Sequence, residues 1–177
     1  MDENNILEDF NRIPAFFRDY LIKFVEILEK KYEKNLLSVI LYGSIARGTW
    51  NLESDIDIFL LFSNKIKERE KLDKDVLKTI IEFEKTIHII NDNGIQIYFP
   101  IQELSLKLKD LVNFRTLFYD ISMDGIVIYD KDLIGTKFLE KIRIRIKDKG
   151  LERIFVGYND FYWKRKENVK FGEIIEL

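Results

Sequence analysis

Two short apolar runs, separated by a glycine turn, constrain the fold of this chain more than any other part of its sequence. The first run extends from Leu37 to Tyr42 and ends abruptly at Gly43. The second extends from Asp55 to Phe62 and is apolar at every position except its two aspartates. Runs of this length, bounded by turn residues, are typical of buried β-strands. The sequence therefore predicts two strands, with one helical turn at Ile45 to Gly48 in the loop between them.

The second predicted strand carries two carboxylates, Asp55 and Asp57, which are separated by one residue. Alternate side chains of a strand point to the same face, so both carboxylates should project together while Ile56 and Ile58 face a core. Paired carboxylates repel each other and lose hydration, and a bound cation offsets that cost. Hard divalent cations prefer oxygen ligands of this kind. We therefore expect a metal site on this strand.

The composition is typical of one soluble globular domain. The chain has 177 residues, of which 46% are hydrophobic and 14% aromatic, which argues against disorder. It has no cysteine, which excludes disulfides and thiolate metal sites and suits a reducing cytoplasm. A net charge of −2 gives no general attraction to nucleic acid, and no apolar run approaches the roughly 20 residues of a membrane span. We expect a single cytoplasmic domain over residues 1–177, with a core at about 14–130 and a C-terminal extension at about 131–177, and no contact with membranes.

The remaining chain alternates predicted helices with predicted short strands. Apolar residues at helical spacing predict helices at residues 14–35, Val76–Asn91 and Leu108–Met123. Short strands are predicted at Ile95–Phe99 and at Ile126–Tyr129, the latter at a sheet edge. The segment Leu133–Lys149 fits either a strand or a helix, and its length and caps favour a helix. The segment Arg153–Arg165 is expected to form a hairpin that turns at Asn159-Asp160.

The sequence Gly43-Ser44-x-Ala46-Arg47-Gly48, followed by Ser54-Asp55-x-Asp57, resembles the signature of the polymerase-β-type nucleotidyltransferase superfamily. The similarity is greatest to the minimal nucleotidyltransferases, and the C-terminal tail is similar to that of stand-alone archaeal members. The resemblance covers residues 37–62. It implies an α/β (α+β) fold with a small mixed sheet, helices packed mainly on one face, and an added C-terminal helix and β-hairpin.

The resemblance also implies roles for individual residues. Gly43 would let the backbone approach a triphosphate, and Ser44 would offer its hydroxyl and N–H groups to phosphate oxygens. Arg47 is either a phosphate contact or the ion-pair partner of a carboxylate, and Ser54 is either a nucleotide contact or a turn residue. Asp55 and Asp57 would be the catalytic acids and the ligands of two Mg²⁺ ions.

One position departs from the family pattern. Active members usually supply a third acid from a neighbouring strand, and chain order assigns that strand to Ile95–Phe99. Its site-facing residue is Gln96, whose amide cannot act as a base. Asp92 and Glu103 flank this strand and are possible substitutes.

Two functions therefore stay open. The first is a Mg²⁺-dependent nucleotidyltransferase that moves a nucleoside monophosphate from an NTP to a hydroxyl of a protein, an RNA or a small molecule, releasing pyrophosphate. The second is a catalytically inactive nucleotide-binding or partner-binding protein, similar to an antitoxin. The minimal group often works beside a small helical protein, so the resemblance implies such a partner. The basic cluster Lys164-Arg165-Lys166 fits a nucleic-acid contact, although a solvated hairpin end explains it better.

Overall fold

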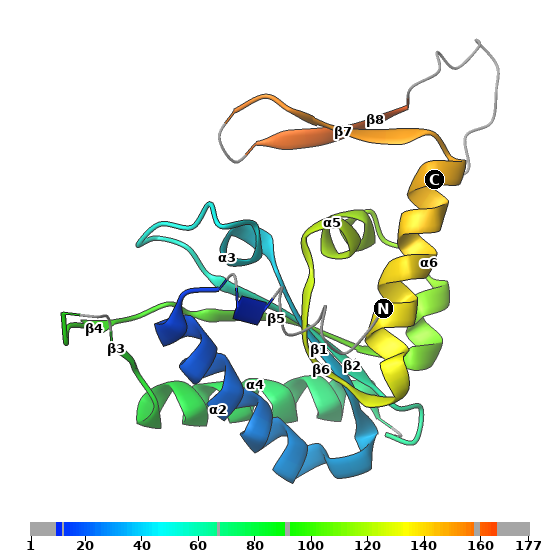
Figure 1. Cartoon of the computed structure of the whole chain (residues 1–177). Coiled ribbons are helices and arrows are strands. Elements are labelled where there is room, and N and C mark those ends of the chain that lie inside the picture. Colours follow the sequence, from blue (N-terminus) through cyan, green and yellow to red (C-terminus); the bar gives the residue numbers. More distant parts are fainter. Residues whose placement is uncertain (1–9, 12, 67, 91–92, 158–159, 166–177) are drawn as a thin grey trace.

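A four-stranded mixed sheet forms the centre of the computed structural model, which describes residues 10–11, 13–66, 68–90, 93–157 and 160–165 (Figure 1). Its strands lie in the order β5-β2-β1-β6, with the bounds β1 Leu36–Tyr42, β2 Ile56–Phe62, β5 Ile101–Lys107 and β6 Ile126–Asp130. β1 pairs antiparallel with β2 and β6, whereas β2 and β5 are parallel. The predicted strands at β1, β2 and the sheet edge are confirmed.

Helices cover both faces of this sheet. α2 (Ala15–Tyr32) and α4 (Arg69–Thr86) pack on one face, and α5 (Leu117–Asp124) and α6 (Ile134–Asp148) pack on the other (Figure 1). Along β2, Ile58 and Leu60 contact the first layer, whereas Phe59 and Leu61 contact the second. The fold class is confirmed, but the expectation of helices mainly on one face is wrong. A strand that is apolar at consecutive positions needs cover on both sides.

The predicted helices differ in how well their bounds match the structure. α2 follows Pro14 and buries the predicted stripe of Phe17, Leu21, Phe24, Val25, Leu28 and Tyr32. α6 confirms that Leu133–Lys149 is helical, and the Asp130 carboxylate accepts hydrogen bonds from the N–H groups of Gly135 and Thr136 at 2.7 and 2.9 Å. This carboxylate satisfies donors that a helix start leaves unpaired.

Two other predicted helices have different bounds. α4 begins at Arg69, before the predicted start at Val76, and it ends at Thr86, before the predicted end at Asn91. The predicted helix at Leu108–Met123 divides into a 3₁₀ segment and α5. The short 3₁₀ segments are η1 Glu33–Asn35, η2 Leu108–Val112 and η3 Lys131–Leu133.

The prediction of a core strand at Ile95–Phe99 is wrong. Only β4 (Gln96–Ile97) is extended there, and it pairs with β3 (Ile89–Ile90) in a separate small hairpin. The side chain of Ile95 is 59% exposed, which a residue in a buried strand would not be. β2 pairs instead with β5, whose sequence is IQELSLK. Alternation alone could not distinguish these two segments, because both contain apolar residues at alternate positions.

The C-terminal hairpin is present as predicted. Its strands β7 (Leu151–Phe155) and β8 (Phe161–Arg165) form their own two-stranded sheet. Figure 1 shows the hairpin extending from the end of α6 over the side of the molecule where α3 and α5 lie. Asn159 of its predicted turn lies outside the described residues. Among the described residues, no helix combines the length and the apolar character that a membrane crossing requires.

Candidate nucleotide site

The turn at the end of β1 is fitted closely against the start of β2. α3 (Gly43–Arg47) follows β1 directly, and Gly43 has a φ of 75°, in the left-handed region that favours glycine. A Cβ atom at this position would overlap Oδ2 of Asp57 and would lie 2.8 Å from its Cγ. The register explains the proximity, since Tyr42 of β1 pairs with Asp57 of β2. Only glycine leaves room here for the carboxylate.

Ser44 is the second residue of the short helix α3 and follows Gly43 directly. Gly48, with a φ of 76°, ends the helix by donating its N–H to the carbonyl of Ile45 at 3.1 Å. The Thr49 N–H donates to the Ser44 carbonyl at 2.9 Å. The Ser44 side chain is half-buried and has no hydrogen-bond partner among the residues that the structure describes. Its hydroxyl is therefore available to a ligand.

Asp55 and Asp57 lie together as the sequence predicts. Asp57 belongs to β2, whereas Asp55 precedes its first residue, and both are half-buried. Burial, together with the nearby charge of Asp55, raises the pKa of Asp57 to about 6, and the charge of Arg47 limits this rise. When a carboxylate with a raised pKa lies beside a second carboxylate, a bound cation stabilises the ionised form of both. The pair therefore fits a hard divalent ion.

The residue on β5 that is level with Asp57 is Gln102. The order of the segments in the chain predicted Gln96 at this position, and that prediction is wrong. Gln96 instead lies on the separate β3–β4 hairpin. An amide oxygen is a neutral and weaker ligand than a carboxylate. Within the described parts of the chain, no group of three or more His, Cys, Asp or Glu residues is arranged to hold a metal ion.

Neither acid suggested as a substitute lies beside the pair. Glu103 is level with Ile58, so it points to the face covered by α2 and α4, opposite to Asp57. Burial raises the pKa of Glu103, and the charge of Asp73 on α4 adds to the effect. Asp92 lies outside the described residues. The described site therefore has two carboxylates and one amide.

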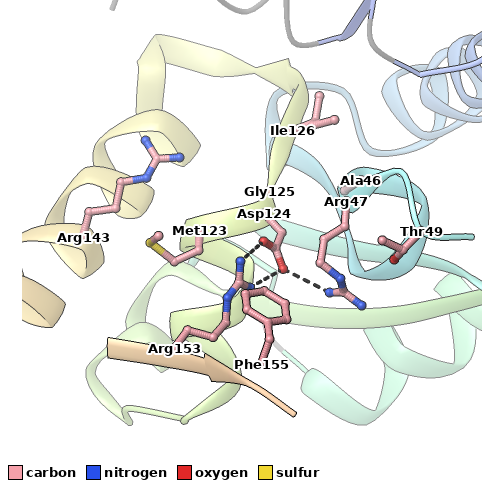
Figure 2. Close-up of a pocket in the computed structure, with 10 residues that line it drawn as sticks. All are labelled: Ala46, Arg47, Thr49, Met123, Asp124, Gly125, Ile126, Arg143, Arg153 and Phe155. Carbon is pink, nitrogen blue, oxygen red and sulfur yellow. Dashed lines mark hydrogen bonds and ion pairs between the residues drawn. The ribbon is translucent and has the colours of Figure 1, made fainter. Parts of the chain in front are cut away.

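Arg47 forms the ion pair that was the alternative to a phosphate contact. Its Nη1 lies 3.0 Å from Oδ2 of Asp124, at the end of α5 (Figure 2). Arg153 of β7 donates to both oxygens of the same carboxylate at 2.7 Å. The Asp124 side chain is only 5% exposed. Asp124 and Arg153 were not identified from the sequence, because nothing local to either residue marks it as a partner of Arg47.

Ser54 closes a local turn. Its hydroxyl accepts a hydrogen bond from the Asn51 N–H at 2.9 Å, and its own N–H donates to the Asn51 carbonyl at 3.1 Å. These bonds match the turn role that the sequence left open.

Tyr42 was missed as a site residue, although its position directly before Gly43 could have suggested it. Burial, together with the nearby charges of Asp57 and Glu103, raises the pKa of Tyr42 to about 12.

Comparison with known proteins identifies the family. The sequence of residues 21–175 matches the nucleotidyltransferase domain family. The chain belongs to this family. The resemblance inferred from the glycine turn and the paired aspartates is therefore confirmed, and the nucleotidyltransferase domain includes α3 and both aspartates.

Two relatives come from Methanocaldococcus jannaschii and are provisionally named protein adenylyltransferases. MJ1305 is 32% identical over 127 residues, which cover 72% of this chain and 81% of the relative. MJ0604 is 46% identical over 39 residues, which cover 22% of this chain and 39% of the relative. A solved structure of the MntA–HpeT toxin–antitoxin has 16% identity and a TM-score of 0.44, covering 72% of this chain and 89% of that one. That score is too low to relate the two structures in detail.

Proposed function

We propose that this nucleotidyltransferase transfers a nucleoside monophosphate, AMP in particular, from an NTP to a hydroxyl group of a protein. The observation that carries the proposal is the close fit of the Asp57 carboxylate against the Gly43 turn, with Asp55 beside it. In this proposal the Gly43 turn binds phosphate and the two neighbouring carboxylates bind the metal ion. The choice of AMP and of a protein acceptor is supported by the names of the two archaeal relatives.

Each residue of the site has a role in this proposal. The hydroxyl and N–H groups of Ser44 bind phosphate oxygens, and Gly43 keeps the approach free of a side chain. Asp55 and Asp57 would hold Mg²⁺, which neutralises charge on the triphosphate when it is bound. The acceptor oxygen forms a bond to the α-phosphorus, the bond to the pyrophosphate oxygen breaks, and the acceptor proton passes to water. Positioning and charge neutralisation supply most of the rate in such reactions.

A second candidate is nucleotide binding without transfer. Gln102 favours it, because the neighbouring strand provides an amide where a carboxylate would complete the metal site. An amide cannot remove the proton of the acceptor hydroxyl. In this alternative the protein binds a nucleotide, and a partner senses the bound state.

Labelled ATP, CTP, GTP and UTP distinguish the two candidates. The full chain is incubated with each nucleotide, Mg²⁺ and either candidate proteins or RNA, and the same reactions are run with Asp55→Asn/Asp57→Asn. The control is Glu53→Gln, which removes an exposed acid next to the site. Transfer to protein by the parent and the control, but not by the double variant, supports transfer. Binding without label transfer to any acceptor supports the second candidate, and equal nucleotide affinity in Mg²⁺ and EDTA would contradict the metal assignment.

Three expectations accompany the proposal as predictions. They are a cytoplasmic location, a small helical protein partner and a second Mg²⁺ ion in the site. A third carboxylate would stabilise the second ion. The substitution Gln102→Glu, which adds such a carboxylate, therefore tests whether the second ion binds.

A further inference from the structure

The C-terminal hairpin is tied to α3, the short helix that begins at the Gly43 turn. Arg153 of β7 donates to both oxygens of the Asp124 carboxylate at 2.7 Å. Nη1 of Arg47, the last residue of α3, lies 3.0 Å from Oδ2 of the same carboxylate (Figure 2). Asp124 is itself the last residue of α5. One carboxylate therefore joins α3, α5 and the hairpin.

This junction contains little water. The side chains of Asp124, Arg153 and Arg47 are only 5%, 14% and 17% exposed. The ring centroid of Phe161, on β8, lies 5.5 and 4.8 Å from the guanidinium carbons of Arg47 and Arg153. Charged hydrogen bonds that are shielded from water hold their partners more firmly than exposed ion pairs do. The hairpin therefore limits the movement of Arg47.

Protein carboxylates balance the charges of both arginines. Arg153 and Arg47 limit the rise in the pKa of Asp120 that burial causes, and Arg47 does the same for Asp57. With Asp124, three carboxylates thus lie near Arg47 and Arg153. The charge of Arg47 is offset within the protein, so this arginine can act as a structural link without a bound phosphate.

The link acts on the helix that carries the proposed phosphate contacts. α3 has five residues, so Arg47 lies about 6 Å along the helix axis from Gly43. Ile45 and Ala46 bury one side of this helix in the core, and Arg47 connects its end to the hairpin. A helix this short moves as a unit, so a shift of Arg47 displaces Ser44 as well.

We propose that the C-terminal hairpin positions the phosphate-binding turn, because Arg153 and Asp124 hold Arg47 and thereby hold α3. In this role Arg47, Asp124 and Arg153 are positioning residues, and none of them contacts the nucleotide. The inference rests on the proposed function, since it takes the Gly43 turn as the place where the triphosphate binds. It adds that nucleotide affinity depends on a hairpin more than 100 residues further along the chain.

The test is calorimetric titration of the full chain with ATP at saturating Mg²⁺ and, separately, with Mn²⁺ alone, at constant pH. Arg153→Gln is the decisive variant, because Arg153 reaches α3 only through its neighbours in the junction. Arg47→Gln removes the link itself, whereas Arg47→Lys keeps a cation for Asp124. The control is Lys31→Gln, which removes a cation from a partly buried ion pair with Asp75 near the opposite end of β1.

Arg153→Gln and Arg47→Gln should each weaken ATP binding about 10-fold, which is typical of coupling through a contiguous network. Arg47→Lys should restore most of the affinity, and Lys31→Gln should leave it unchanged. The Mn²⁺ affinity of Arg153→Gln should equal that of the parent, because β2 carries Asp57 and makes no ion pair with the hairpin among the described residues. Equal losses of ATP and Mn²⁺ affinity would indicate general destabilisation and would overturn the proposal.

Two further results would also overturn it. If Arg47→Gln weakens ATP binding and Arg153→Gln does not, Arg47 contacts the nucleotide directly. If neither variant weakens binding, the junction has no role in the site. In both cases, loss of ATP binding in Asp55→Asn/Asp57→Asn shows that the proposed function still holds, whereas ATP binding that is independent of these aspartates contradicts both proposals.

Thermal unfolding shows whether each variant is folded. If Arg153→Gln does not fold, Phe161→Leu replaces it in the same titrations. This variant removes the ring that lies beside both arginines and leaves every charge in place. The expected weakening of ATP binding and the results that overturn the proposal are then the same.

Discussion

The Asp57 carboxylate occupies the space that any side chain at Gly43 would need. This contact joins the residue that follows β1 to the second residue of β2. The carboxylate can occupy this position because Gly43 has no Cβ. Because Gly43 also has a left-handed φ, both the backbone conformation and the contact exclude larger residues.

Gly43→Ala is therefore expected to lower stability and to displace Asp57. The left-handed backbone alone costs about 1–2 kcal/mol in a residue with a Cβ, and the overlap with the carboxylate adds to this. Denaturant unfolding measures the stability, and titration with Mg²⁺ and ATP measures the site. Gly48→Ala is the matched control, because Gly48 has nearly the same φ but no atom within 4 Å of the added Cβ. Similar losses in both variants would contradict the role of the contact.

The raised pKa of Asp57 predicts a definite pH dependence. The folded-state pKa of about 6 lies above the ordinary aspartate value of 3.8, so the fold disfavours the ionised form. The contribution of Asp57 to stability is thus fully present below about pH 4 and is lost as the pH rises through about 6. In the absence of metal, the Asp57→Asn variant should have a higher Tm than the parent protein at pH 7.5. This difference in Tm should disappear towards pH 4.

Metal binding should show the opposite dependence on pH. A divalent ion needs the carboxylate ionised, so Mg²⁺ affinity is expected to rise as the pH increases through about 6. Isothermal titration between pH 5 and 8 measures this. A Mg²⁺ affinity that is constant over this range would show that Asp57 is not a ligand.

Gln102→Glu should restore a third carboxylate beside Asp57. Affinity for divalent ions increases with the number of charged ligands, so we expect roughly 10-fold tighter Mg²⁺ or Mn²⁺ binding. Nucleotidyl transfer, if present in the parent, should increase as well. The control is Glu103→Gln on the opposite face of β5, which should leave the affinity for metal unchanged. Loss of metal binding in Glu103→Gln would show that Glu103 reaches the site after all.

Asp124→Asn should be strongly destabilising. The substitution removes the charge that Arg47 and Arg153 share while leaving both guanidinium groups poorly hydrated. Removing one partner of a buried ion pair lowers the free energy of unfolding by about 3 kcal/mol. Glu82→Gln is the comparison, because the Lys78–Glu82 pair is exposed and contributes less than about 0.5 kcal/mol. A small effect at Asp124 would mean that water replaces the lost carboxylate.

The features that the sequence predicted well are those encoded within one short segment. Gly43, Asp55 and Asp57 lie close together in the chain, and the spacing of the two aspartates was enough to predict that they lie near each other. The stripe of α2 could be identified for the same reason, since its apolar residues follow one helical period. These patterns depend on local geometry and not on the arrangement of distant segments.

The features that could not be predicted depend on pairing between distant segments. Gln102 is placed by the parallel register of β5 with β2, and the segment containing Gln96 had an equally good strand pattern. Arg47 and Asp124 are 77 residues apart, and no periodicity relates them. Glu103 differs from Gln102 by one position, yet that single step moves its side chain to the other face of the sheet.

The sheet topology has a consequence for the order in which the site assembles during folding. β1 and β2 are antiparallel neighbours joined by residues 43–55, which include α3, so they pair across a much shorter stretch of chain than β2 and β5 and at a lower entropic cost. β5 is parallel to β2 and reaches it only after the chain has passed through α4 and the β3–β4 hairpin. We therefore expect the glycine turn and the paired carboxylates to form early, and Gln102 to join them in a later and slower step.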